Sequence, residues 1–272
     1  MICVWNSRQK PKVKLALKPK REAKVLQVLL ALDAASHNID ALETAITLAS
    51  QLRAELIGLF IEDIDLVRSA NLPFAREIAA ETGKERLITA DYIERALRAW
   101  SAEVQSQLAK EAKKANIKCT FRTVHNRRIE TLLSETGESN LLIISHSRHQ
   151  LVSPITRADV VYLLFDGSTE AHHAVAIASE MALRGLTHVV LIDSCSGEVE
   201  YSAKKAADWL IRHGVHVLIQ KLQGDPDKSL PPLLKKYPAA LLLVPAHFPT
   251  QQAPDTLVKL QNKLNCPVVI VR

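Results

Sequence analysis

The chain has 272 residues, a net charge of +6 and 47% hydrophobic residues, which is enough to bury a core and excludes a chain disordered throughout. No two of its eight glycines lie within nine positions of each other, which excludes the phosphate loops G-x-G-x-x-G and G-x-x-x-x-G-K-[ST]. The charge is uneven, because residues 1–24 carry +7 and the other 248 residues sum to −1.

The basic segment 1–24 allows two interpretations. Either it binds an anionic partner, nucleic acid or a membrane surface, or it is a solubilising tail. It contains no apolar stretch as long as a secretory signal needs, and no later stretch predicts a transmembrane helix. The four cysteines form no C-x-x-C pair. We therefore expect a reduced, cytoplasmic protein.

Continuous apolar runs predict buried strands at residues 29–33, 56–59, 119–124 and 141–145 in the first part of the chain. Helices are predicted at residues 39–52 and 89–115, with a short one from residue 129. The long helix has an apolar stripe at 3–4 spacing, formed by Ile93, Leu97, Trp100, Val104, Leu108 and Ala112.

The same order of elements begins again 133 residues later, which indicates an internal repeat. Leu29-Leu30-Ala31-Leu32-Asp33 aligns with Tyr162-Leu163-Leu164-Phe165-Asp166, and Leu56-Ile57-Gly58-Leu59 aligns with Val189-Val190-Leu191-Ile192. In this second copy, strands are predicted at residues 160–165, 189–192, 215–219, 240–244 and 267–271. Helices are predicted after Ser168 or Thr169, which are candidate N-caps, and at residues 203–212, 230–236 and 255–264.

Strands that alternate with helices predict an α/β fold with a parallel sheet in each copy. Ligands of such sheets bind beyond the carboxyl ends of the strands, at the switch point. The sequence therefore points to the turns after the first and fourth strand of each copy. These turns are residues 33–36 with 145–149, and residues 166–168 with 245–248.

The first copy contains extra residues, most of them in the insertion, residues 64–88. One interpretation is a lid or a partner-binding loop. The other is a structural flap over the sheet, which we favour because Leu72, Phe74 and Ile78 are apolar and suited to burial.

At these residues the chain resembles the universal stress protein family in its tandem two-domain form. The resemblance rests on the two strands that end in Asp33 and Asp166, on the alanine-rich helices that follow, and on the closing Cys266-Pro267-Val268-Val269-Ile270-Val271-Arg272. It implies two Rossmann-like domains of the adenine nucleotide alpha hydrolase type, at residues 25–157 and 158–272. Only 16 residues separate His149 from Asp166, so we expect the first domain to be truncated at its C-terminal end, without a fifth strand.

Nucleotide-binding members of this family hold ATP with G-x2-G-x9-G-[ST] after the fourth strand, where bare backbone approaches the phosphates. The first copy instead reads Ser145-His146-Ser147-Arg148-His149, and the second reads Pro245-Ala246-His247-Phe248. We therefore predict degenerate nucleotide sites and no bound cofactor. The alternative that the resemblance implies is bound ATP.

Candidate ligand-binding residues remain at the predicted crevices, and each has a structural alternative as a cap or a solvated loop residue. They are Asp33, His146, Ser147, Arg148, Asp166, Gly167, Ser168 and His247. The histidines follow no metal-binding motif, so no metal site is predicted, and no catalytic set is assigned.

The resulting hypothesis is a non-enzymatic, universal-stress-like protein that acts as a regulatory or scaffolding module in a stress response. The alternative is a sensor of a small molecule or adenine nucleotide at the carboxyl ends of the strands. Because the resemblance implies that the last strand pairs across a dyad, we also expect a homodimer through residues 267–271.

Overall fold

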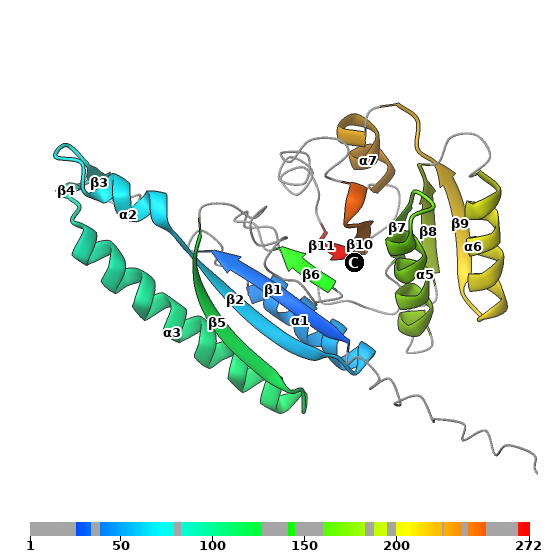
Figure 1. The fold of residues 1–272 in the computed structure, drawn as a ribbon, viewed down its shortest axis with the longest axis horizontal. Coiled ribbons are helices and arrows are strands. Elements are labelled where there is room, and N and C mark those ends of the chain that lie inside the picture. Colours follow the sequence, from blue (N-terminus) through cyan, green and yellow to red (C-terminus); the bar gives the residue numbers. More distant parts are fainter. Residues whose placement is uncertain are drawn as a thin grey trace, which may run out of the picture.

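The structure is a computed structural model that describes residues 26–33, 39–78, 83–126, 141–144, 160–182, 188–194, 200–224, 226–234, 239–248 and 266–272. These residues form one nine-stranded sheet with the order β5-β2-β1-β6-β11-β10-β7-β8-β9 (Figure 1). The basic segment 1–24, the predicted helices from residue 129 and at residues 255–264, and both predicted domain boundaries lie outside the described residues.

The first half of the sheet contains four parallel strands in the order β5-β2-β1-β6, as the sequence predicts. They are β1 (Gln27–Asp33), β2 (Glu55–Asp63), β5 (Cys119–Asn126) and β6 (Leu141–Ile144). Two helices, α1 (Ile39–Leu52) and α3 (Ala90–Lys114), pack against them. Helix α3 begins after Thr89, whose Oγ1 accepts a hydrogen bond from Tyr92 N at 3.3 Å, so the predicted long helix is confirmed.

Gly58 on β2 lies against the side chains of Leu108 from α3 and Phe121 from β5. A Cβ at this position would meet Leu108 Cδ2 at 2.4 Å and Phe121 Cδ2 at 2.8 Å. Both distances are shorter than any normal contact between carbon atoms. A side chain at position 58 would therefore require Leu108 and Phe121 to shift.

The second half repeats this order and adds a fifth strand. Its strands are β7 (Val160–Phe165), β8 (His188–Asp193), β9 (His216–Lys221), β10 (Ala239–Pro245) and β11 (Val268–Val271). Its helices are α5 (Thr169–Ala182), α6 (Glu200–Arg212) and α7 (Pro226–Leu234). The predicted elements are therefore present in the described residues, with ends that shift by a few residues.

The two halves meet at β11, which is paired on both edges. It runs parallel to β10, with Val269 opposite Leu243, and antiparallel to β6, with Val269 opposite Ile143. Within the described residues, β11 therefore provides the first half with a fifth strand. The interface predicted for the homodimer, the edge of residues 267–271, is wrong, because this edge is already hydrogen-bonded to β6 within the chain.

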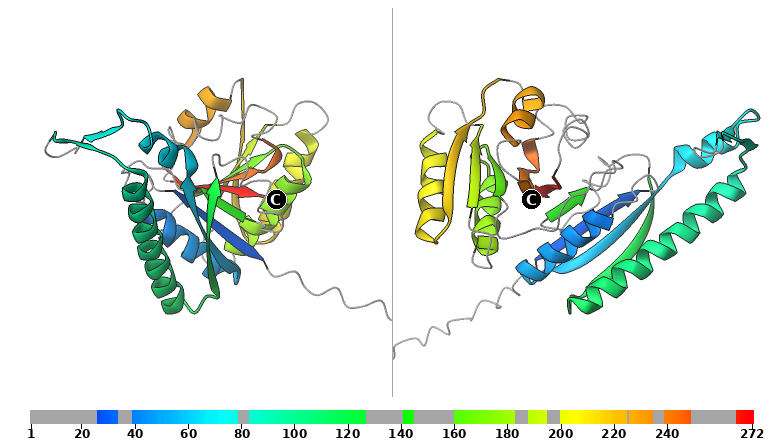
Figure 2. Two further views of the ribbon diagram at one scale, coloured as in Figure 1. Left: turned by 60° about the vertical axis from the view of Figure 1, so that its left-hand side comes forward. Right: turned by 180° about the vertical axis from the view of Figure 1, so that it is seen from behind.

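The insertion projects away from the sheet (Figures 1 and 2). It contains α2 (Ile64–Ala70) and an antiparallel hairpin of β3 (Arg76–Ile78) and β4 (Glu85–Leu87). Phe74 is 74% exposed and Ile78 65% exposed, and Leu72 is also exposed. The prediction of a flap that buries these three side chains is wrong, because the hairpin extends beyond the sheet instead of folding over it.

The core lies on both faces of the sheet as two aliphatic clusters. Helices α1, α5 and α6 bury their apolar sides on one face, where Leu48, Met181 and Leu210 are fully covered. Helix α7 contributes Leu230 and Leu234 to the other face. Strands buried on both sides explain the continuous apolar runs of the sequence. Within the described ranges, no helix is long and apolar enough to cross a membrane.

Candidate functional site

The turn after β7 contains three of the predicted site residues, and their polar groups are used to hold the turn. Asp166 Oδ1 accepts a hydrogen bond from Ser168 N at 2.9 Å, and Ser168 Oγ accepts one from Ala171 N at 3.1 Å, which caps α5. Gly167 has a φ of 81°, a left-handed conformation that favours glycine. The turn is therefore shaped by local bonds of the kind given as the structural alternative for these residues.

The turn after β10 lies beside it, as the switch-point rule predicts. His247 Nε2 lies 3.1 Å from Glu170 Oε1 in the first turn of α5, so the two turns are in contact through side chains. Pro245 has no N–H, and Ala246 N donates to Val271 O at 2.8 Å. Phe248 is buried in the core. The backbone at residues 245 and 246 therefore has no free N–H group to donate to a phosphate.

Arg272 adds a cation to this edge, which the sequence reasoning missed. Strand β11 runs parallel to β10, so Arg272 follows the carboxyl end of the sheet. His173 Nδ1 on α5 lies 3.1 Å from the main-chain oxygen of Arg272. Partial burial lowers the pKa of the Arg272 guanidinium from its ordinary value. Its position after the last strand was the available signal, because the fifth strand ends at the same edge as the first.

The corresponding crevice of the first half is only partly described. Strands β1 and β6 are parallel neighbours, with Ala31 opposite Ile144, so their carboxyl ends lie side by side. Asp33 is the last residue of β1. His146, Ser147 and Arg148 lie outside the described residues, so their role stays a prediction.

A cleft of about 620 Å³ opens at the carboxyl ends of β2 and β5, beneath α2 and α3. Its walls include Glu62 from β2, Thr123 and His125 from β5, and Arg98 and Ser101 from α3. Ile64 and Val67 of the insertion add an apolar wall. The sequence reasoning missed this cleft, because it applied the strand-end rule to the first and fourth strands only. The polar residues Glu62, Thr123 and His125 near the ends of the second and third strands were the available signal.

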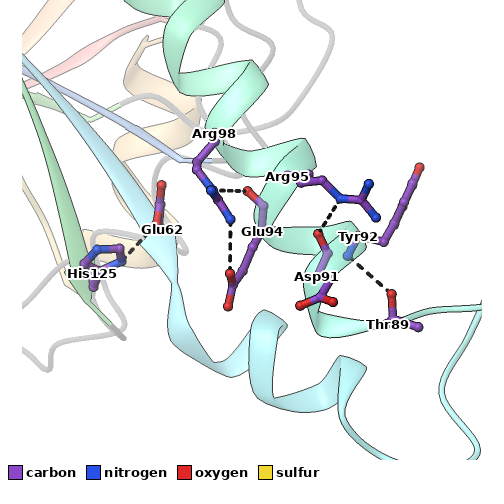
Figure 3. A network of polar contacts seen from close by, with 8 residues as sticks. All are labelled: Glu62, Thr89, Asp91, Tyr92, Glu94, Arg95, Arg98 and His125. Carbon is purple, nitrogen blue, oxygen red and sulfur yellow. Dashed lines mark hydrogen bonds and ion pairs between the residues drawn. The ribbon is translucent and has the colours of Figure 1, made fainter.

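Polar contacts organise this cleft (Figure 3). His125 Nδ1 lies 2.9 Å from Glu62 Oε2, and the carboxylate side chain is only 15% exposed, whereas the imidazole side chain is 72% exposed. Arg98 pairs with Glu94 at 3.3 Å along the surface of α3. The hydroxyls of Ser101 and Thr123 share a hydrogen bond of 3.1 Å.

These contacts suit the recognition of a small polar molecule. A mostly buried carboxylate accepts hydrogen bonds from an amine or hydroxyl, and the arginine and imidazole donate. The Ser101 hydroxyl bonds to Thr123, not to the imidazole, so the described cleft contains no nucleophile activated by a base. No group of three or more His, Cys, Asp or Glu is placed to hold a metal ion in the part of the chain that the structure describes.

Solved structures with the same fold include universal stress proteins. A universal stress protein from Archaeoglobus fulgidus superposes with a TM-score of 0.59 at 14% identity, over 90% of this chain and 96% of that chain. A functionally unknown protein from Pseudomonas aeruginosa has a TM-score of 0.52 at 12% identity, over 91% and 92% of the two chains. No protein-family model and no curated protein matches the chain. The chain therefore has the fold of universal stress proteins, and its function is argued from its own residues.

Proposed function

We propose that the chain is a non-enzymatic, universal-stress-like protein that acts as a regulatory or scaffolding module with degenerate nucleotide sites. The observation that supports this proposal is the turn after β10, in which Pro245 lacks an N–H and Ala246 N is bonded to Val271 O. A phosphate loop needs several free backbone donors that point at one anion. Here the same stretch of chain is used to fasten β11 to the sheet.

The side chains of the second crevice support the same conclusion. Asp166, Ser168 and His247 each have a partner within the protein, so a ligand would have to break these bonds before it gained its own. Each such exchange returns little net free energy, because one hydrogen bond replaces another. Affinity for a nucleotide would then depend on the predicted residues His146, Ser147 and Arg148 of the first half.

Nucleotide binding by the full chain tests the proposal. We expect native mass spectrometry to find no nucleotide on the purified protein, and added ATP to leave the melting temperature unchanged. A ligand at 100 times its dissociation constant would stabilise the fold by about 2.7 kcal/mol, which thermal unfolding detects readily. One or two nucleotides retained per chain would contradict the proposal. Loss of this binding in Arg148→Gln, with retention in Arg127→Gln, would then assign it to the first-half loop.

A second candidate function is a small-molecule sensor, and the cleft of about 620 Å³ favours it. The test is native mass spectrometry of freshly purified protein, with Glu62→Gln as the variant and Glu170→Gln in the second half as its matched control. A sensor retains a small ligand that Glu62→Gln loses and Glu170→Gln keeps. Retention by both variants, or no ligand in any of the three proteins, counts against a site at Glu62. The cytoplasmic location and the anionic partner of residues 1–24 stay predictions.

A further inference from the structure

The outer edge of β9 combines an open strand with exposed apolar side chains. In the described part of the chain, no strand pairs with β9 on the side away from β8. Leu218 and Ile219 of this strand are 40% and 42% exposed, and Trp209 and Ile211 on the adjoining α6 are also exposed. An open strand edge that carries large apolar side chains is a site at which another chain can pair.

The direction of the main-chain groups along β9 follows from the contact at its end. Leu222 N donates to Asp193 O at 2.8 Å, toward β8. Successive residues of a strand direct their N–H and C=O groups to alternate sides, and the β8–β9 register is regular from His216 to Lys221. Val217 and Ile219 therefore direct their main-chain groups to the open edge, whereas Leu218 directs its groups toward β8.

The opposite edge of the sheet, β5, does not have these properties. By the strand registers and the 133-residue repeat, Leu218 corresponds to Thr120 and Gln220 corresponds to Arg122. Both β5 residues are exposed, and the charged Arg122 lies within the strand, whereas the lysine of β9, Lys221, is its last residue. Phe121, the β5 residue that corresponds to Ile219, is partly buried against the core, so the exposed apolar pair Leu218 and Ile219 is found on β9 and not on β5.

We propose that β9 is the homodimer interface, and that it pairs antiparallel with β9 of a second copy about a twofold axis perpendicular to the sheet. In this register Val217 lies opposite Ile219 of the second copy, and Leu218 lies opposite its own equivalent. The Val217–Ile219 pairs exchange both main-chain hydrogen bonds, and they occur twice because of the symmetry. Every apolar residue of the strand then faces another apolar residue.

The self-complementarity of β9 identifies the occupant as a second copy. Two neighbouring registers keep the same main-chain directions, and both set Leu218 opposite a polar residue, Gln220 in one and His216 in the other. A twofold axis perpendicular to the sheet also leaves α6 of both copies on one face. Residues two apart on a helix point in nearly opposite directions, so one of the exposed side chains Trp209 and Ile211 then faces the same helix of the other copy.

The oligomeric state of the full chain tests this interface. We expect light scattering at micromolar concentration to give twice the chain mass of 30.1 kDa. Leu218→Lys should give the monomer mass, because the symmetry places two lysines opposite each other. The matched control is Leu66→Lys in the insertion, a leucine that is also 40% exposed, and it should remain a dimer. Circular dichroism of both variants verifies that they are folded.

A wild-type monomer would overturn the proposal. A dimer that Leu66→Lys dissociates and Leu218→Lys does not would equally overturn it, since the interface would then lie on the insertion.

Cysteine crosslinking tests the register without disturbing the interface. Facing residues of a non-hydrogen-bonded antiparallel pair have Cα atoms about 4.5 Å apart, within the range of a disulfide. Oxidised Leu218→Cys should therefore run as a covalent dimer, whereas Ile219→Cys and the wild type, with its four native cysteines, should run as monomers. Crosslinking of Ile219→Cys in place of Leu218→Cys would overturn the proposed register.

Discussion

The two halves of the sheet share one strand order and differ most at their outer ends. In the first half, α3 has 25 residues, and a Cβ at Gly58 would meet its Leu108 at 2.4 Å. In the second half, α6 has 13 residues, and Leu191, the residue that the repeat aligns with Gly58, is buried in the same core cluster as Leu210 of α6. The comparison teaches that the two halves share the order of their strands, while the residues beneath their outer helices differ.

The two halves also differ at the carboxyl ends of their strands. The second half uses Asp166, Ser168 and His247 to fasten its turns, whereas the first half opens a cleft between α3 and the ends of β2 and β5. The insertion, which the second half lacks, provides one wall of this cleft. A small-molecule site is therefore better supported in the first half, at a position that the family resemblance does not indicate.

The pairing of β11 with β6, which joins the two halves, should give the largest effect on stability. Val271 O accepts from Ala246 N on the β10 side, so Ile270 directs its N–H toward β6. We expect Ile270→Pro to lower the free energy of unfolding by about 3 kcal/mol or more, measured by urea unfolding. The control Ile270→Val keeps the N–H and should cost about 0.5–1.5 kcal/mol. Equal losses in the two variants would mean that the β11–β6 pairing does not join the halves.

Substitutions at Leu191 and Gly58, beneath the outer helices, should give the second-largest loss of stability. Leu191→Ala leaves a cavity beneath α6 and should cost about 2–5 kcal/mol. Gly58→Leu forces α3 away from β2 and should cost about 1–3 kcal/mol. Both values come from thermal or urea unfolding. A Gly58→Leu protein as stable as the wild type would show that α3 moves freely, and the contrast between the halves would fail.

The N-caps of α3 and α5 should give similar, smaller effects. Thr89 Oγ1 and Ser168 Oγ each accept a backbone hydrogen bond in the first turn of their helix. Thr89→Ala and Ser168→Ala should each cost about 1 kcal/mol. Thr89→Ser, which keeps the oxygen, is the control and should retain most of the stability. If only one of the two alanine variants lost stability, the two helices would differ in how much they depend on their N-caps.

The pH dependence at the start of β2 should give the smallest effect. Lys118 Nζ lies 2.5 Å from Glu55 Oε1, and this hydrogen bond lowers the pKa of the Glu55 carboxyl from 4.5. A lowered folded-state pKa gives stability that is present above the unfolded pKa and lost as the pH falls through the folded pKa. Wild-type melting temperatures should therefore fall more below about pH 5 than those of Glu55→Gln or Lys118→Met. Identical pH profiles would show that the Glu55–Lys118 pair does not contribute to the pH dependence of stability.

The candidate site was predicted only in part, and the reason is visible in Glu62 and His125. Their positions near strand ends were readable, but they lie 63 residues apart and their pairing depends on the β2–β5 register. The turn at Asp166, Gly167 and Ser168 was correctly located, because a strand followed by a capped helix is a local pattern. The predicted burial of Phe74 and Ile78 was wrong, because apolar character alone does not determine which segments lie nearby.

The sequence by itself determined the order and type of the elements. Periodicity, N-caps and continuous apolar runs act over a few residues, so the repeated order of strands and the long helix that ends at Lys114 were visible in it. Only the tertiary structure decided that β11 serves both halves, that the insertion stands exposed, and that a cleft opens beside α3. These features depend on which distant segments meet, and pairing between β6 and β11 joins residues more than 120 positions apart, beyond the range of any local pattern.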